Sequence, residues 1–139
     1  KMPTKGTTGS AGYDIYAPNK TIVPGSVSDN EGKVSIGRAL ISTGISVSLP
    51  DDTVGRLGSR SGMSVRSNIE VGAGWIDSDY RGEIKVELKN LGPCPFIVNV
   101  GDKIAQLIVL QLASVDLQIA DVLNNTERGS GGFGSTGSG

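Results

Sequence analysis

The sequence predicts a single all-β domain, either a sandwich or a barrel. Apolar and polar residues alternate over short runs, and turn residues separate these runs at spacings of roughly 8–12 residues, which is typical of small β-sheet folds. Nowhere in the sequence does a long apolar stripe recur with the 3.6-residue period of a helix. The length of 139 residues is that of one domain.

The first part of the chain begins with a loop or arm at residues 1–12, which are rich in glycine, threonine and serine. Alternation of apolar side chains then predicts strands over residues 13–17, 21–23, 39–42, 44–49 and 53–57. Residues 25–38 are polar and punctuated by glycine, so we expect an exposed excursion with its tip at 30–33. Pro50-Asp51-Asp52 predicts a turn.

The middle of the chain breaks the strand pattern at residues 58–64, where Ser59 or Ser61 is placed to cap one helical turn. Two alternating runs, 69–71 and 83–89, then flank the segment Gly72–Gly82, which predicts a β-hairpin with a long turn. That turn holds three glycines, two carboxylates, two aromatic residues and one arginine. Glycines let a backbone approach a ligand closely, and a carboxylate beside them can handle a proton or a metal.

The last part of the chain predicts strands over residues 96–98, 103–112 and 115–119, with Gly101-Asp102 as a hairpin turn between the first two. The final twelve residues, 128–139, include six glycines and three serines, and this composition favours a flexible tail. Arg128 and Phe133 fit a different interpretation. A lid over a nucleotide needs a phosphate partner and a ring that stacks on a base.

Composition and charge exclude several classes of protein. The net charge of -1 predicts neither a nucleic-acid nor a membrane surface, and apolar runs fall short of the roughly 18–20 residues of a membrane span. The single cysteine excludes an intrachain disulfide and fits a reducing compartment. Histidine is absent, which removes Ser–His and Cys–His catalysis and the usual zinc ligand sets. Acid–base chemistry must therefore use carboxylates, lysine, tyrosine or metal-bound water.

Several candidate residues have two interpretations when each is taken alone. Arg60-Ser61-Gly62 offers a fixed cation, a hydroxyl and an open backbone N–H, which suit a phosphate, but a surface loop with a solvated arginine has the same composition. Asp77 and Asp79 fit either acid–base chemistry or simple turn formation. Gln106 lies in an apolar run and needs a polar partner, for which a neighbouring loop suffices.

Taken together, these segments resemble the trimeric deoxyuridine triphosphate nucleotidohydrolases, the dUTPases. That family has five ordered motifs, and the matching segments here are Ala11-Gly12-Tyr13-Asp14-Ile15, Arg56-Leu57-Gly58-Ser59-Arg60-Ser61-Gly62-Met63, Gly74-Trp75-Ile76-Asp77-Ser78-Asp79-Tyr80-Arg81-Gly82, Gly101-Asp102-Lys103-Ile104-Ala105-Gln106-Leu107-Ile108 and Arg128-Gly129-Ser130-Gly131-Gly132-Phe133-Gly134-Ser135-Thr136-Gly137. The family usually has alanine at Gly58, proline at Ser59 and a small aliphatic residue at Trp75. The excursion at 25–38 is longer than usual.

The resemblance implies a distorted jelly-roll or β-clip-like barrel that forms a homotrimer with the C-terminal arm exchanged between subunits. Residues 1–127 would form the β domain, and 128–139 the arm that closes over the active site. The implied reaction is hydrolysis of dUTP to dUMP and pyrophosphate by attack of water at the α-phosphorus, with Mg²⁺ on the triphosphate. It keeps uracil out of DNA and supplies dUMP for dTTP synthesis. The implied setting is intracellular, cytoplasmic or nuclear, or that of a viral enzyme in its host cell.

The resemblance also implies a role for each motif residue. Asp77 would be the general base, and Tyr80 would pack under the deoxyribose. Backbone groups of Gly74, Ile76 and their neighbours would pair with uracil. The phosphates would be held by Arg60, Ser61, Gly62 and Gln106, with Arg128 on the γ-phosphate. Phe133, followed by Gly134 in the arm, would stack on uracil, and Asp14 would reach Mg²⁺ through water.

Three other functions compete with this interpretation. A regulatory protein of the same fold would bind dUTP and a protein partner, and the excursion at 25–38 is the one hint of a partner surface. A deoxycytidine triphosphate deaminase is disfavoured because Asp77 and Tyr80 stand in the dUTPase arrangement. A structural β-sandwich does not explain why Arg60-Ser61-Gly62, Asp77, Tyr80 and the C-terminal tail occur together.

Overall fold

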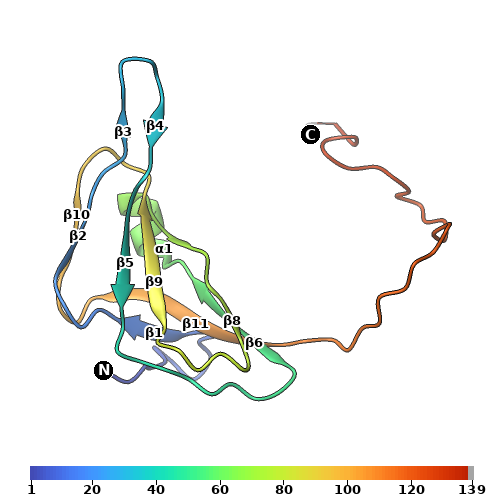
Figure 1. Cartoon of the computed structure of the whole chain (residues 1–139), viewed down its shortest axis with the longest axis horizontal. Coiled ribbons are helices and arrows are strands. Elements are labelled where there is room, and N and C mark those ends of the chain that lie inside the picture. The colour runs from blue at the N-terminus through green and yellow to red at the C-terminus, as the bar shows by residue number, and fades with distance from the viewer. Residues whose placement is uncertain (138–139) are drawn as a thin grey trace.

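The computed structural model describes residues 1–137 and consists almost entirely of β-strands, as the sequence predicts (Figure 1). The main sheet has the strand order β1-β11-β6-β8, with every neighbouring pair antiparallel. Its strands are β1 (Tyr13–Tyr16), β11 (Lys103–Gln111), β6 (Thr53–Gly58) and β8 (Trp75–Asp77). The second sheet, of order β5-β9-β7, comprises β5 (Gly37–Ser42), β9 (Lys85–Asn90) and β7 (Ile69–Gly72).

Two short ribbons and a helix complete this jelly-roll-like fold. Strands β2 (Thr21–Val23) and β10 (Phe96–Val98) pair with one another, as do β3 (Val27–Ser28) and β4 (Val34–Ser35). The helix α1 (Ser61–Ser67) follows β6 directly. Among the described residues, no helix has both the length and the hydropathy needed to cross a membrane.

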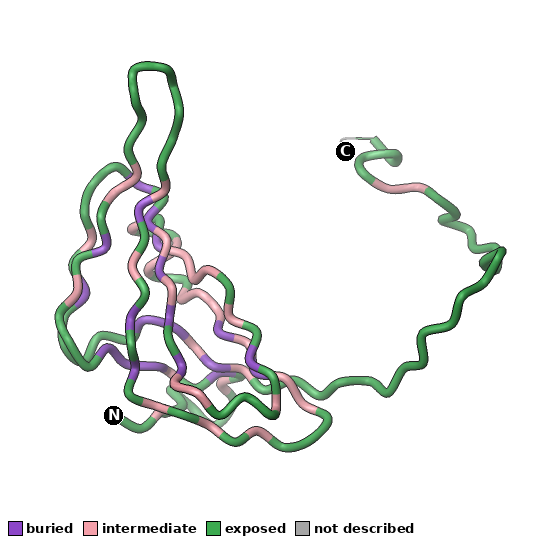
Figure 2. The backbone as a smooth tube through the Cα atoms, viewed as in Figure 1, coloured by how far each residue is buried: buried purple, intermediate pink, exposed green. Residues whose placement is uncertain are grey.

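The hydrophobic core is made by the inward faces of the strands (Figure 2). In the main sheet, Ile15, Leu57 and Leu107 are buried, and the neighbours of Leu57 and Leu107 face outward because side chains alternate along a strand. Tyr16, next to Ile15, is buried as well, where the register of β1 shifts. The register sets Gln106 opposite Asp14 on one side and Gly58 on the other, so these three residues share the outward face. The polar residues of the first, second and fourth motifs thus meet on one surface.

Residues 44–49 were expected to form a strand, and this prediction is wrong. Gly44 turns the chain with a φ of +71°, and the segment that follows is irregular. Ile45, Val47 and Leu49 nevertheless pack against the core. The apolar residues alternate in the sequence because one side of this segment packs against the core, although the segment pairs with no strand.

The predicted hairpin around Gly72–Gly82 forms, but with an additional strand inside it. Its arms pair as expected, because β7 runs antiparallel to β9 with Val71 opposite Leu88. Within the long turn, residues 75–77 leave this sheet and pair with β6 in the main sheet. The segment therefore links the two sheets.

Gly101-Asp102 forms a turn, with a φ of +84° at Gly101, but the hairpin predicted across it is wrong. Strand β10 pairs with β2, whereas β11 pairs with β1 and β6. The turn therefore carries the chain from one sheet to another. The pairing partner of a strand depends on distant segments, which a local turn signal does not encode.

The short helix is present as predicted, but its start differs from the expectation. Arg60 occupies the N-cap position, and the described structure contains no side-chain hydrogen bond that caps the helix. The Ser59 hydroxyl instead accepts a hydrogen bond from the Val71 N–H at 2.9 Å. Ser59 therefore fastens the start of the helical segment to β7.

The excursion at 25–38 is an exposed hairpin, formed by β3 and β4, that projects from the body (Figure 1). The Asp29 carboxylate accepts the backbone N–H groups of Glu31 and Lys33, each at 2.9 Å, which closes the tip. The predicted exposed excursion is confirmed for residues 27–35, whereas Gly37, the first residue of β5, is buried.

The chain leaves the body after β11 and runs outward as an extended segment (Figures 1 and 2). Residues 112–130 are exposed. The strand predicted over 115–119 is not formed there, since these residues are irregular and lie away from every strand of the chain. Their alternating apolar side chains, Val115, Leu117 and Ile119, have no surface of this chain against which to pack.

Candidate active site

A polar hollow of about 420 Å³ lies where β1 and β11 meet the start of α1. It is lined by Gly6, Ser10, Ala11, Gly12, Asp14, Arg60, Ser61, Lys103 and Gln106. The Asp14 carboxylate makes an ion pair with the Arg60 guanidinium, and its second oxygen lies 2.9 Å from the Lys103 ammonium. One carboxylate between two cations leaves a net positive charge, which suits an anionic ligand.

Gln106 lines this polar hollow, and its side chain is held by a hydrogen bond. Its Nε2 donates to the Ser59 carbonyl at 3.0 Å, so the amide binds a neighbouring loop, as its position in an apolar strand led us to expect. A Cβ atom on Gly12 would come within 2.7 Å of Gln106 Oε1. A larger residue than Gly12 would therefore displace the Gln106 amide or move the chain away from β11.

A second, narrower hollow of about 230 Å³ lies between β8 and the segment that precedes β9. Its lining residues are Leu57, Gly74, Trp75, Ile76, Asp77, Tyr80, Glu83, Ile84 and Lys85. Because β8 is the edge strand of the main sheet, one side of its backbone is not paired by a strand. The hollow lies along this edge, where peptide groups can bind a ligand.

The backbone of β8 alternates between its two sides. The Gly74 carbonyl accepts the Leu57 N–H at 2.8 Å and so points toward β6. In an antiparallel pair the next residue directs its peptide groups the other way, so those of Trp75 and Asp77 face the open edge. Ile76 is buried in the core and anchors the strand.

A tight turn sets the geometry of Asp77 and Tyr80. The Tyr80 N–H donates to the Asp77 carbonyl at 3.1 Å, and the Tyr80 hydroxyl donates to the Glu83 carbonyl at 2.9 Å. A Cβ atom on Gly82 would lie 2.4 Å from the tyrosine hydroxyl, so glycine is required under the ring. The Asp77 carboxylate is exposed at the mouth of this narrow hollow.

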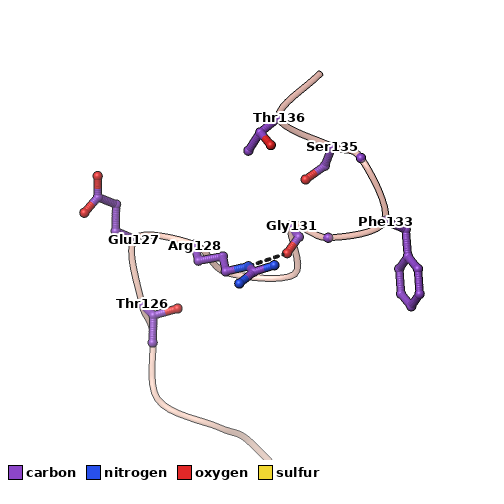
Figure 3. Close-up of a pocket in the computed structure, with 9 residues that line it drawn as sticks. Thr126, Glu127, Arg128, Gly131, Phe133, Ser135 and Thr136 are labelled. Atoms are coloured by element: carbon purple, nitrogen blue, oxygen red, sulfur yellow. Dashed lines mark hydrogen bonds between the residues drawn. The ribbon is translucent and has the colours of Figure 1, made fainter. Parts of the chain in front are cut away.

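The glycine-rich tail forms a loop of its own (Figure 3). Arg128 Nε donates to the Gly131 carbonyl at 2.8 Å across this loop, while the Phe133 ring points outward into solvent. Arg128, Phe133 and Gly134 thus lie away from both hollows. Residues 138–139 of the predicted arm lie outside the described residues.

The predicted site residues therefore fall into three groups within one chain. Asp14, Arg60, Ser61 and Gln106 share the polar hollow, with Gly62 exposed beside it. Gly74, Ile76, Asp77 and Tyr80 share the narrow hollow. Strands β1 and β8 are the two edges of the main sheet, three strand spacings or roughly 14 Å apart, so the two hollows are separate.

Residue-by-residue reasoning on the sequence missed Lys103, which completes the polar hollow. The signal for it was available, because Lys103 lies in the fourth motif three residues before Gln106. Only the pairing of β1 with β11 brings it to Asp14. Glu83 and Lys85 were likewise not singled out, although both line the narrow hollow.

Glu70 is the one group in the described part of the chain with a clearly displaced pKa. A hydrogen bond from Ser59, with a second from Ser64, holds the pKa of Glu70 below its usual value, and burial opposes this only slightly. Ser59 thus forms hydrogen bonds with two residues of β7, Val71 and Glu70. The serine that stands where proline is usual therefore has its own polar partners.

A metal ion would find few protein ligands here. Residues 1–137 contain no cluster of three or more carboxylate, cysteine or histidine groups suited to a metal. Asp14 is the carboxylate of the polar hollow, and it is already paired with two cations. This donor set fits Mg²⁺, which keeps several waters and takes phosphate oxygens with one or two carboxylates.

Comparison with known proteins identifies relatives along the whole chain. The family model described as dUTPase matches residues 1–137. The deoxyuridine 5'-triphosphate nucleotidohydrolase of Candida albicans is 45% identical over 139 residues, covering 99% of this chain and 81% of the relative. The protein of that name from Paramecium bursaria Chlorella virus 1 is 44% identical over 135 residues, covering 97% and 89%.

Solved structures share the fold. The dUTPase of Staphylococcus bacteriophage 80alpha with dUPNHPP superposes with a TM-score of 0.85 at 25% identity, covering 99% of this chain and 92% of that one. That phage enzyme is described as controlling transfer of virulence genes. A variant dUTPase of phage phi11, described with a structural Mg(II) ion, has a TM-score of 0.75 at 24% identity, covering 88% and 90%.

Proposed function

This chain belongs to the dUTPase family, and we propose that it hydrolyses dUTP to dUMP and pyrophosphate by attack of water at the α-phosphorus. The observation that carries the proposal is the turn that holds Asp77 and Tyr80 side by side at the mouth of the narrow hollow. Phosphoryl transfer needs positioning and charge neutralisation more than covalent help. A carboxylate, a base pocket and a cationic hollow are sufficient parts, even in a chain without histidine.

The narrow hollow is the proposed uracil site. In the Gly74–Asp77 segment, Trp75 and Asp77 offer both peptide donors and acceptors to the base edge, whereas the roles expected of Gly74 and Ile76 need correction because their peptide groups face β6. The Gly74 carbonyl is shared with the Leu57 N–H, whereas the peptide groups of Trp75 and Asp77 face the open edge. A site built to pair with uracil leaves these groups unpaired when cytosine enters, which rejects cytosine strongly. The Tyr80 ring closes the deoxyribose side.

Asp77 is the proposed general base. Its carboxylate is exposed, where water has access, and its backbone is fixed by the bond to Tyr80. In this role Asp77 orients the attacking water and accepts its proton. General-base catalysis typically contributes about 10²- to 10⁴-fold in rate.

The polar hollow is the proposed triphosphate site. Arg60, Ser61 and Gln106 line it, Gly62 adjoins it, and Lys103 adds a cation that the motif roles did not include. Asp14 holds Arg60 and Lys103 in place and, through water, would reach a Mg²⁺ carried by the triphosphate. When bound, the metal supplies charge neutralisation on the phosphates.

The proposed active site is shared between copies of the chain in a homotrimer. The narrow hollow, the polar hollow and the tail lie apart within one chain, so one nucleotide can meet all three only if different copies contribute them. Exposed apolar residues of the extended segment, such as Leu117 and Ile119, are expected to pack on a neighbour.

The arm is the proposed lid. Residues 128–139 would close over a neighbour's site, with Arg128 on the γ-phosphate and Phe133, next to Gly134, on the base. Residues 1–127 then form the β domain, which includes the extended segment from residue 112 to residue 127. The proposed setting is inside a cell, either the organism's own or that of an infected host.

The test is pyrophosphate release with Mg²⁺ across the deoxynucleoside triphosphates. We expect dUTP to yield dUMP and pyrophosphate in equal amounts, with the other nucleotides far slower. Tight dUTP binding without turnover would support the regulatory alternative, which the names of the relatives do not favour. Ammonia release from dCTP would support a deaminase. Either result would reject the proposed function.

A further inference from the structure

Trp75, the one tryptophan of the chain, stacks on an arginine at the wall of the narrow hollow. The Arg56 guanidinium carbon lies 4.8 Å from the centre of the Trp75 ring, although the tryptophan is 63% exposed. The two residues face one another across β6 and β8. Since the Leu57–Gly74 pair beside them is hydrogen-bonded, Arg56 and Trp75 form a non-hydrogen-bonded pair, in which facing side chains lie closest.

Arg56 makes a second contact, with the turn that precedes β8. Its Nη1 donates to the Ala73 carbonyl at 3.1 Å. Ala73 has a φ of +41° and Gly74 a φ of +115°, so two consecutive residues occupy a region that side chains other than glycine avoid. An alanine stays there only when surrounding contacts hold it. The bonds from Arg56 to Ala73 and from Leu57 to Gly74 are the two that the structure provides.

This turn leads directly into the wall of the hollow, formed by Gly74, Trp75 and Ile76. We propose that Arg56 and Trp75 act as a positioning pair that holds the Ala73–Gly74 turn and thereby sets the geometry of the base site and its preference for uracil. The guanidinium contacts both the indole face and the Ala73 carbonyl, so its movement into solvent would break both contacts and release the turn. A small aliphatic residue in place of Trp75 would leave one side of this clamp open.

The inference rests on the proposed function, and it makes a separate prediction. A pair that shapes only the base site affects binding of the base and leaves the phosphate contacts intact. Loss of the pair therefore raises KM for dUTP and weakens dUMP, while inhibition by pyrophosphate alone is unchanged. A merely structural role would instead lower the folded fraction and thus the apparent kcat, with KM unchanged.

The experiment compares Arg56→Gln, Trp75→Val and the conservative Trp75→Phe with the wild type, and with Arg38→Gln as a control for loss of an exposed arginine. We expect Arg56→Gln, which loses both the cation–π contact and the hydrogen bond to Ala73, to raise KM for dUTP roughly tenfold. Trp75→Val loses the cation–π contact alone and should raise KM several-fold. The ratio of kcat/KM for dUTP over dCTP should fall by a similar factor. Trp75→Phe keeps an aromatic face for the guanidinium, so its KM and selectivity should lie close to those of the wild type. Arg38→Gln should match the wild type.

Intrinsic fluorescence gives a direct reading, because Trp75 is the chain's one tryptophan. Adding dUMP should change the emission of the wild type, and Arg56→Gln should shift it without nucleotide. An unchanged KM and unchanged nucleotide selectivity in both disruptive variants would overturn the inference. A change of oligomeric state in Trp75→Val with normal selectivity would overturn it too, in favour of an interface role. Absence of dUTP turnover in the wild type would instead reject the proposed function.

Discussion

The Ser59 hydroxyl accepts the Val71 N–H at 2.9 Å, while the Ser59 carbonyl accepts Gln106 Nε2 at 3.0 Å. One residue thus ties the end of β6 to both sheets, through β7 and β11. The carbonyl contact needs only a backbone, whereas the hydroxyl contact needs serine. The two can therefore be separated by mutation.

Ser59→Ala should lower the free energy of unfolding by roughly 1–2 kcal/mol, because it removes the hydrogen bonds of the hydroxyl with Val71 and with Glu70. The KM for dUTP should stay near that of the wild type, because the carbonyl that orients Gln106 remains. Urea denaturation and steady-state kinetics check the two parts. Ser48→Ala, at an exposed position, serves as the control. A large rise in KM with normal stability would show that the hydroxyl serves the phosphates instead.

Asp77→Asn should bind dUTP yet turn over at least about a hundredfold more slowly, the lower range for loss of a general base. Asparagine keeps the shape of the turn but accepts no proton. The matched control is Asp79→Asn, two residues along in the same turn and also exposed, which should retain most of the activity. Single-turnover kinetics with a separate binding assay distinguish the two steps. Unchanged turnover in Asp77→Asn would exclude its assigned role.

Removal of residues 128–139 should leave a folded assembly of unchanged size with poor turnover. The core strands end before this segment, and its described residues, 128–137, lie away from the body in the single chain (Figure 1). Light scattering should give three times the 14.3 kDa mass for the full chain, and a trimer after truncation as well. If truncation yields monomers, the arm has a structural role and the lid proposal fails.

Chelation of Mg²⁺ should slow dUTP hydrolysis, and Asp14→Asn should raise the Mg²⁺ concentration needed for half-maximal rate. The carboxylate holds Arg60 and Lys103 and, in the proposed site, would reach the metal through water, so its loss would affect two contacts of the triphosphate. Titrating Mg²⁺ at fixed dUTP measures the effect. The role assigned to Asp14 would be wrong if the variant showed the same Mg²⁺ dependence as the wild type.

Glu70 should make stability depend on pH at the acidic end. Hydrogen bonds from Ser59 and Ser64 lower its pKa in the folded state from an ordinary value of 4.5. A lowered pKa contributes stability that is fully present above the unfolded value and is lost as pH falls through the folded value. Urea denaturation from pH 7 downward should therefore show a loss below about pH 4.5 that Glu70→Gln lacks. Glu31→Gln, at the exposed hairpin tip, should follow the wild type.

Much of the fold is predictable from local pattern. Strands β6 and β9 follow from alternation because each buries one face against the core, and β1 follows from it up to Ile15, beyond which Tyr16 is buried as well. Strand β8 is not predictable in this way. Its three residues lie in a glycine-rich turn between β7 and β9 of the second sheet, yet they pair with β6 of the main sheet. Alternation was misleading at Ile45, Val47 and Leu49, where side chains are half-buried without a strand partner.

The site is predictable as a set of residues but not as an arrangement. Motif spacing identifies Asp14, Arg60 and Gln106, yet only the pairing of β1 with β11 brings them together and adds Lys103. The contact of Arg56 with Trp75 likewise depends on register between strands of a single sheet. In the proposed trimer, the two hollows and the tail would meet through contacts between copies, which no pattern within one chain encodes.

Hydrolysis of dUTP in ¹⁸O-labelled water tests the central claim most directly. Attack of water on the α-phosphorus places one labelled oxygen in dUMP and none in pyrophosphate, which mass spectrometry of the two products resolves. We expect the label in dUMP alone for the wild type, with the rate of its appearance reduced in Asp77→Asn. Label in pyrophosphate, or no labelled product at all, would contradict the account.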